Sequence, residues 1–329
     1  MRPIRLATGL ATATVLSVTA SGCVTVHGEL EVVPAATRSE AAQALKAFTS
    51  AYNAADKAYD PALDADRVTG PLGAINQAGL KARQKNHPDG NPDHSPLELT
   101  DATYLIPKKA GWPRWFLADT DSNRDQDSGE TDSRWLVVFV KSGPDAGWKA
   151  AYLSVVRPSR LPAFAKDGDG LARPVAADSA ALAVAPQDLS TQYTQYLQKG
   201  APDVFAPGSA TSGWRETRRT TRRAGFSYQY IDQPLDSGSF GPLGLETDDG
   251  GALVFFSSKH FERQTAAKGL RPPLNADAEA LLTGEVESTL TKERVSGQLV
   301  YVPKKGSTKD GGKVVLLNRL PGLTAAKGS

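Results

Sequence analysis

The stretch that decides the fold reads RWLVVFVKSGPDAGWKAAYLSVV and occupies residues 134–156. Two runs of β-branched and aromatic residues flank SGPDAG, whose glycine, proline and aspartate favour turns. The pattern predicts two neighbouring strands joined by a short connection. Similar runs precede it, ATYLIP at 102–107 and RWFLADT at 114–120. The sequence therefore predicts a four-stranded, mainly antiparallel meander over this region.

Helices are predicted before these strands. Thr37 and Glu40 have the spacing of a capping box, and Leu45, Phe48 and Tyr52 recur at helical intervals after it. A second helix is predicted around GAINQAGLKARQKN, residues 73–86. Helices followed by an antiparallel meander are typical of an α+β layer, with the helices packed on one face of a curved sheet.

The second half of the chain repeats this order. A helix is predicted over LSTQYTQYLQK, 189–199, with Asp188 as its N-cap and Gly200 at its end. Strand candidates follow in GFSYQYI, ALVFFSSKHFE, QLVYVP and KVVLLNRL, and a short helix in NADAEALL. We therefore expect an α+β protein of two modules, 39–157 and 188–329, each with N-terminal helices on a curved, mainly antiparallel sheet. The segment 158–187, with four prolines and DGDG, is the predicted linker.

The N-terminus is typical of an export signal. Arg2 and Arg5 precede an uncharged stretch that ends in small residues before Cys23. Ala20-Ser21-Gly22-Cys23 resembles a bacterial lipobox, in which the cysteine after the cut carries a diacylglyceryl group. We expect residues 1–22 to be a lipoprotein signal peptide and 23–38 a lipidated tether, because two acyl chains hold a protein stably on a bilayer. The predicted location is the extracytoplasmic face of the cell membrane.

Composition excludes several classes of site. The chain has 38 basic and 36 acidic residues, and removal of Arg2 and Arg5 with the leader leaves 36 of each. A neutral, exported chain argues against nucleic acid as a partner. Cys23 is the only cysteine, so the mature chain has no disulfide, thiolate metal site or cysteine nucleophile. The sequence assigns no catalytic residue, although a carboxylate-based hydrolase stays open because folding can bring distant acids together.

An acidic segment, DTDSNRDQDSGE at 119–130, has oxygen-bearing side chains at the spacing of a calcium loop. The candidate ligands are Asp119, Asp121, Asn123, Asp125, Asp127 and Glu130. Position 6, where calcium loops carry glycine, is Arg124, and the flanks have strand rather than helix character. The alternative is a solvated acidic hairpin tip, so Ca²⁺ is the one cofactor that the sequence suggests.

An arginine segment, WRETRRTTRRAGFSYQY at 214–230, is the candidate anion-binding site. Its basic residues are Arg215, Arg218, Arg219, Arg222 and Arg223. Outside the cell such residues meet lipid headgroups and phosphate-rich wall polymers, and arginine pairs with phosphate through two parallel hydrogen bonds. The alternative is an ion-paired or solvated face.

The histidines give no standard metal-site spacing. His87 and His94 lie in a loop with Asp89 and Asp93, where a zinc site would need folding to assemble it. His260 lies within a predicted strand, and we expect it to be a structural histidine.

The order of helices and bent antiparallel sheet resembles the cone-shaped α+β fold of the nuclear transport factor two superfamily. The AYNAAD, RWFLADTD and 134–156 stretches, with the lipobox, resemble extracytoplasmic lipoproteins of actinobacteria. The resemblance implies a cellular location and a fold, and it assigns no catalytic residue. The leading hypothesis is a membrane-anchored, non-enzymatic binding protein for an envelope protein, an anionic wall polymer or a small ligand. Its alternatives are an extracytoplasmic hydrolase and a calcium-dependent adhesion or signalling protein.

Overall fold

The structure is a computed structural model that describes residues 31–126 and 128–329. The predicted signal peptide, Cys23 and the calcium candidate Asp127 lie outside the described residues. The helices are α1 Arg38–Ala58, α2 Gly70–Asn86, α3 Leu189–Lys199, α4 Ser212–Thr220 and α5 Ala276–Ala280. The strands of the first half are β1 Val33–Pro34, β2 Leu99–Leu105, β3 Lys108–Lys109, β4 Arg114–Ser122, β5 Arg134–Lys141 and β6 Lys149–Val156. Those of the second half are β7 Phe226–Leu235, β8 Leu243–Glu246, β9 Ala252–Ala266, β10 Leu282–Thr283, β11 Thr289–Val302 and β12 Val315–Gly328.

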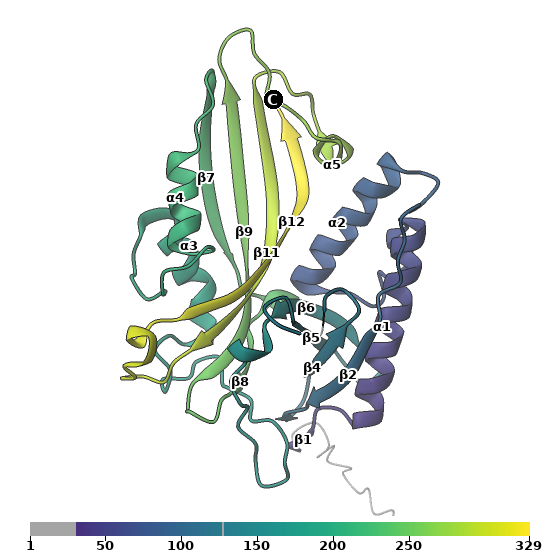
Figure 1. Cartoon of the computed structure of the whole chain (residues 1–329), viewed down its shortest axis with the longest axis vertical. Coiled ribbons are helices and arrows are strands. Elements are labelled where there is room, and N and C mark those ends of the chain that lie inside the picture. Colours follow the sequence, from purple (N-terminus) through teal and green to yellow (C-terminus); the bar gives the residue numbers. More distant parts are fainter. Residues whose placement is uncertain (1–30, 127) are drawn as a thin grey trace, which may run out of the picture.

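The α+β class is confirmed, and the strands form two main sheets (Figure 1). The first is an antiparallel meander in the order β2-β4-β5-β6. The second has the order β10-β12-β11-β9-β7, with β8 also paired to β9, and only the β10–β12 pair is parallel. Among the described residues, no helix is both long and apolar enough to cross a bilayer.

Helix α1 begins where the sequence predicts. The Thr37 side chain accepts a hydrogen bond from the Glu40 backbone N–H, and the Glu40 carboxylate accepts one from the Thr37 N–H, which completes the capping box. Its apolar face then covers the first sheet, where Phe48 meets Phe139 edge-on with ring centres 5.9 Å apart. Phe139 in turn stacks on Phe116 at 4.9 Å, so aromatic packing fixes the helix on the sheet.

The two sheets share a core. Leu117, Leu136 and Val138 of the first sheet are completely buried in one cluster with Phe255 and Leu299 of the second. Helix α2 also packs on strands of both sheets, β6, β11 and β12. A Cβ at Gly322 of β12 would lie only 2.3 Å from Ile75 of this helix, so glycine is required for the close approach.

The segment 158–187 is ordered. The Ala172 N–H donates to the Ile106 carbonyl, the Val175 N–H to Gly244 and the Ala183 N–H to Pro303. It therefore runs along both halves of the chain rather than through solvent. The division into two modules stays a prediction, and "first module" and "second module" below denote residues 39–157 and 188–329.

Helix α3 shows one correction. Gly200 ends it in the left-handed conformation, with φ 78°, as predicted. Asp188, however, does not cap it through its side chain, because residues 186–188 already form a 3₁₀ turn and Asp188 has helical backbone angles. The buried face of α3, with Tyr193 and Leu197, packs on the second sheet beside Phe256.

Candidate functional site

A row of polar side chains lines the face of the second sheet that α3 and α4 cover. Residues paired across strands point to the same face, as do residues two apart in one strand. The register pairs Asp232 of β7 with His260 of β9, and His260 with Arg294 of β11. The other polar residues paired across strands are Tyr230, Glu262 and Lys292; Ser258 and Ser296; and Gln298 and Arg319. We call this set, with Arg218 of α4 packed against it, the polar sheet face.

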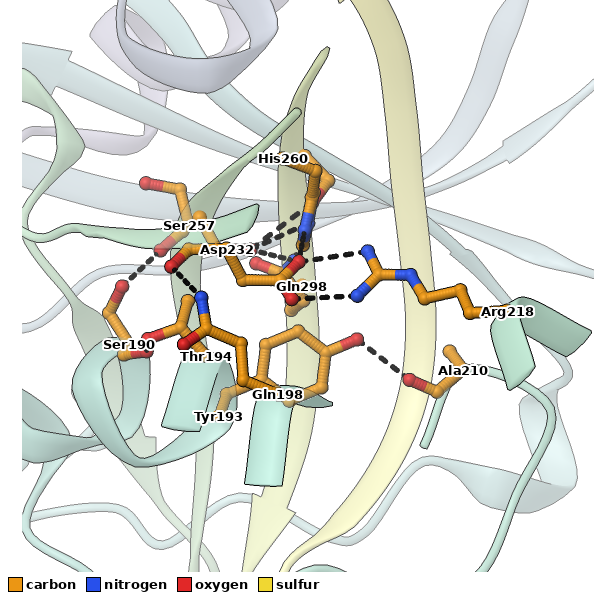
Figure 2. A network of polar contacts seen from close by, with 12 residues as sticks. Ser190, Tyr193, Thr194, Gln198, Ala210, Arg218, Asp232, Ser257, His260 and Gln298 are labelled. Carbon is orange, nitrogen blue, oxygen red and sulfur yellow. Dashed lines mark hydrogen bonds and ion pairs between the residues drawn. The ribbon is translucent and has the colours of Figure 1, made fainter. Parts of the chain in front are cut away.

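Asp232 is the centre of the hydrogen-bond network on this face (Figure 2). Its Oδ1 accepts hydrogen bonds from His260 Nδ1 at 2.5 Å and Arg218 Nη2 at 2.8 Å, and its Oδ2 accepts one from Arg218 Nη1 at 2.7 Å. The Asp232 side chain is fully buried, and that of Arg218 is only 8% exposed. In a bidentate ion pair that is this buried, each charge compensates the other, so removing either partner leaves an uncompensated charge in the core.

Burial and charge fix the protonation states in this network. Burial works to raise the pKa of Asp232, but the hydrogen bonds from His260 and Arg218 outweigh it and hold the pKa below its ordinary value. Burial, aided by the charges of Arg319 and Arg218, outweighs the opposing effect of Asp232, and together these effects lower the pKa of His260 to about 4. His260 is therefore neutral at pH 7, with Nδ1–H donated to Asp232 and Nε2 left as an acceptor.

Two serines complete the chain of hydrogen bonds. His260 Nε2 lies 2.8 Å from Ser296 Oγ and 3.0 Å from Ser258 Oγ. The connectivity from carboxylate to imidazole to hydroxyl is that of a serine hydrolase. Both serines are fully buried, Asp232 is already neutralised by Arg218, and a histidine with a pKa near 4 is a weak base at neutral pH. In this conformation the arrangement has no accessible nucleophile, and its physical effect is to fix Arg218.

Arg218 also belongs to a stack of aromatic and guanidinium groups. Its Cζ lies 4.7 Å from the ring centre of Trp214 and 5.0 Å from that of Tyr230. Arg319 lies 4.6 Å from the ring centre of Trp214. The buried Nε and Nη2 atoms of Arg319 have no hydrogen-bond partner within the described chain. Burial lowers the pKa of Arg319, and the charge of Arg218 adds to this effect.

Positive charge exceeds negative charge across this face. Arg218, Lys292, Arg294 and Arg319 face two carboxylates, Asp232 and Glu262. The Nζ of Lys292 and the Nη1 of Arg294 both lie 3.9 Å from Glu262, at the outer limit for an ion pair. The surplus makes the surroundings of α4 favourable to an anion.

An open pocket of about 1080 Å³ adjoins this network. The end of α3, one side of α4 and residues 230–232 of β7 line it. Its charged residues are Lys199, Arg215, Arg218, Arg219, Glu216 and Asp232. Arg218 pairs with Asp232 and Arg219 with Glu216, whereas Lys199 and Arg215 form no ion pair with the described residues. We call this the α3–α4 pocket.

Arg215 is held at the rim by packing rather than by a carboxylate. Its Cζ lies 5.3 Å from the ring centre of Tyr196. Its Nη2 would lie 2.6 Å from a Cβ at Gly200, so the guanidinium rests on the bare backbone at the end of α3. The C-terminal end of a helix favours a cation at that place.

The five predicted anion-binding arginines divide into two groups. Arg215, Arg218 and Arg219 lie on α4 and line the pocket. Arg222 and Arg223 follow the helix and do not line it; Arg222 donates to the Thr221 carbonyl, and Arg223 lies 4.5 Å from the ring centre of Phe226. The partners of Arg218 and Arg219 come from the second module and not from the acidic segment 119–130.

The calcium candidates are spread along β4 and the loop after it. Asp119 pairs with Arg134, Asp121 accepts from the Ser122 N–H, and Asn123 accepts from the Glu98 N–H. Asp125 bonds to Ser133, and Glu130 lies 3.9 Å from Arg157. Among the residues that the structure describes, which omit Asp127, no three acidic, histidine or cysteine side chains are grouped closely enough to hold a metal ion. The calcium site stays a prediction.

The other two described histidines lie apart from the polar sheet face. His94 Nδ1 lies 2.8 Å from Asp56 of α1, and His87 packs against Tyr59. The sequence did not single out Asp232, Ser296 or Arg319. In β9 the polar residues of this face are at 258, 260, 262 and 264, but Ser257, Lys259 and Arg263 lie between them, so the sequence shows no clear two-residue alternation of polar and apolar side chains.

Comparisons with known proteins place the chain in a family. A family model described as a domain of unknown function, DUF8094, matches residues 32–328. An uncharacterized lipoprotein of Streptomyces coelicolor is 54% identical over 97% of this chain and 94% of its own length. One of Streptomyces avermitilis is 52% identical, over 98% of this chain and 95% of its own length.

A more distant Streptomyces coelicolor lipoprotein is 27% identical over 70% of this chain and 63% of its own length. No solved structure matches, so the resemblance to the cone fold stays an expectation. Because the family model and the two similar lipoproteins cover nearly the whole chain, the protein belongs to the DUF8094 family of actinobacterial lipoproteins.

Proposed function

We propose that the protein is anchored outside the cell through a diacylglyceryl group on Cys23 and binds an anionic wall polymer in the α3–α4 pocket. Membership in a lipoprotein family and the order of charged, apolar and small residues before Cys23 support the anchor. Mass spectrometry of the native protein should find an N-terminal Cys23 that is heavier by a diacylglycerol unit. An intact leader with a free thiol would contradict the anchor.

One observation carries the binding proposal: Lys199 and Arg215 line an open pocket and form no ion pair with a carboxylate of the described residues. Asp232 and Glu216 are already neutralised by Arg218 and Arg219, so they do not repel an incoming anion strongly. Arginine and lysine favour phosphate oxygens, and the pocket is open to solvent. The favoured ligand is therefore a polymer with phosphodiester groups.

Calorimetric titration tests this assignment. The mature protein should bind a glycerol phosphate oligomer, and Lys199→Ala with Arg215→Ala should weaken binding about ten-fold or more, because each lost ionic contact contributes roughly 1 kcal/mol. The matched control is Lys81→Ala with Lys85→Ala, which removes two exposed charges from α2. It should bind like the wild type.

The same titration separates the chemical classes of ligand. A glutamate oligomer carries carboxylates at similar density, and a neutral dextran carries no charge. Binding of the glutamate oligomer alone would make the ligand a carboxylate. Equal loss of affinity in the pocket and α2 variants, or no binding of any anion, would overturn the proposal.

A further inference from the structure

We propose that the end of the first module where the chain enters is a docking surface for anionic phospholipid headgroups. The inference rests on the proposed anchor at Cys23 and concerns a surface separate from the α3–α4 pocket. We call it the base and define it by Val32, Arg38, Lys109, Trp112, Arg114, Lys141 and Lys166.

Neighbouring elements bring these residues to one end of the module. Strand β1, which lies within the predicted tether 23–38, pairs Val33 with Lys109 of β3, and α1 begins at Arg38, four positions after Pro34. Arg114 and Lys141 are cross-strand partners at the start of β4 and the end of β5. Their charges act on Glu40 in the first turn of α1 and lower its pKa, after the larger effect of its hydrogen bond with Thr37.

The base has the composition of a surface that meets headgroups. Arg38, Lys109, Arg114, Lys141 and Lys166 form no ion pair with the described residues, while the nearby Asp167 and Asp169 are paired with Lys108. Glu40 is engaged in the capping box. Basic residues near an anionic leaflet contribute about 1 kcal/mol each to binding.

Trp112 strengthens the assignment. The Cζ of Arg114 lies 4.6 Å and the Nζ of Lys141 5.6 Å from its ring centre. Tryptophan with basic neighbours is enriched at the level of headgroups, where the ring is half in water. Val32, within the predicted tether, is 61% exposed, which is the highest value among the large apolar side chains described.

A small pocket lies within the base. It has a volume of about 280 Å³ and is lined by Arg38 and Lys166 together with apolar residues that include Ala36, Ile106 and Leu171. Its lining contains two basic residues and no acidic one. A phosphate between the two cations, with its glycerol against the apolar wall, fits this chemistry.

The length of the tether keeps the base near the bilayer. Seven residues lie between Cys23 and Glu31, the first described residue, and a chain spans at most about 3.6 Å per residue. Glu31, which precedes Val32 of the base, therefore lies within about 30 Å of the acylated cysteine. Helix α4 lies on the opposite flank of the molecule from α1, away from β1 (Figure 1). Docking through the base leaves the α3–α4 pocket on a flank of the molecule that does not face the bilayer.

Vesicle binding tests this orientation. The probe is the mature chain with Cys23→Ser, mixed with phosphatidylcholine vesicles with and without phosphatidylglycerol. Wild type should bind only the anionic vesicles, and less so as salt rises. Lys109→Glu with Lys166→Glu should lower the partition coefficient about 30-fold or more, since each basic residue near the surface contributes roughly five-fold.

Arg222→Glu with Arg223→Glu is the matched control, because it makes the same change in charge on the other flank. It should leave vesicle binding unchanged. The assignment would be overturned if only the Arg222→Glu, Arg223→Glu variant lost vesicle binding, or if both variants lost it equally. It would also be overturned if the wild type showed no preference for anionic vesicles. Circular dichroism checks that each variant is folded. If the charge reversal Lys109→Glu with Lys166→Glu unfolds the chain, Lys109→Gln with Lys166→Gln removes the same two charges without reversing them.

The vesicle test and the polymer titration can fail separately. The base variants keep Lys199 and Arg215, so they should bind the glycerol phosphate oligomer like the wild type. If they lose polymer binding while Lys199→Ala with Arg215→Ala does not, the base and not the α3–α4 pocket is the polymer site, and both assignments fail.

Discussion

Asp232→Asn should lower the free energy of unfolding by about 3–5 kcal/mol, which is the cost of removing one partner of a buried ion pair. The substitution leaves Arg218, whose side chain is 8% exposed, and Arg319, with two unpartnered nitrogens, buried without the carboxylate that balances them. The asparagine oxygen can still accept from His260 Nδ1–H, but the amide NH₂ then lies against the Arg218 Nη1 donor, where Asp232 Oδ2 had accepted its hydrogen bond. The thermal midpoint should fall by about 10 °C in a protein of this size.

Glu216→Gln is the control for this prediction. It breaks the ion pair with Arg219 on the same helix, but both side chains are more than half exposed and water screens their attraction. The unfolding midpoint should stay close to that of the wild type. If Asp232→Asn is as stable as Glu216→Gln, Asp232 does not organise the polar sheet face.

Acid should destabilise the protein through His260. Its folded-state pKa of about 4 lies below the ordinary value near 6.5, so the unfolded chain takes up the proton first as the pH falls. The stability contributed by the neutral histidine is complete above pH 6.5 and is lost between pH 6.5 and 4, by about 3 kcal/mol. The lowered pKa of Asp232 acts in the same direction, with loss beginning below its unfolded value near 4.

Urea unfolding between pH 4 and 8 measures this effect. His260→Gln should be less stable than the wild type at pH 7 but should lose less stability from pH 6.5 to 4. His87→Gln changes an exposed histidine in the first module and should keep the wild-type slope. Identical slopes for the wild type and His260→Gln would show that another group controls the acid response.

Local patterns predicted the elements well. The capping box of Thr37 and Glu40 set the start of α1, and the glycine at 200 set the end of α3, because each depends on a few neighbouring residues. The failure at Asp188 has a local cause as well: a 3₁₀ turn over 186–188 placed its backbone in a helical conformation before α3 began.

The site could be predicted only in part. The arginine segment drew attention to Arg215, Arg218 and Arg219, since clustered charge is visible in one stretch of sequence. Asp232, His260 and Ser296 lie on three strands, and only the register of β7, β9 and β11 brings them together. The sequence did not indicate Lys199, because it lies on α3 and only the fold brings it into the same pocket as Arg215 of α4. Pairings of this kind depend on tertiary structure and have no local spacing.

The central claim is that Arg215 contacts an anionic ligand in the α3–α4 pocket. The most direct measurement is nitrogen-15 NMR of the arginine side chains during titration with the glycerol phosphate oligomer. The Nε–Hε signal of Arg215 should shift and saturate, while those of Arg222 and Arg223, which do not line the pocket, should stay in place. Shifts at Arg222 and Arg223 with none at Arg215 would contradict the account.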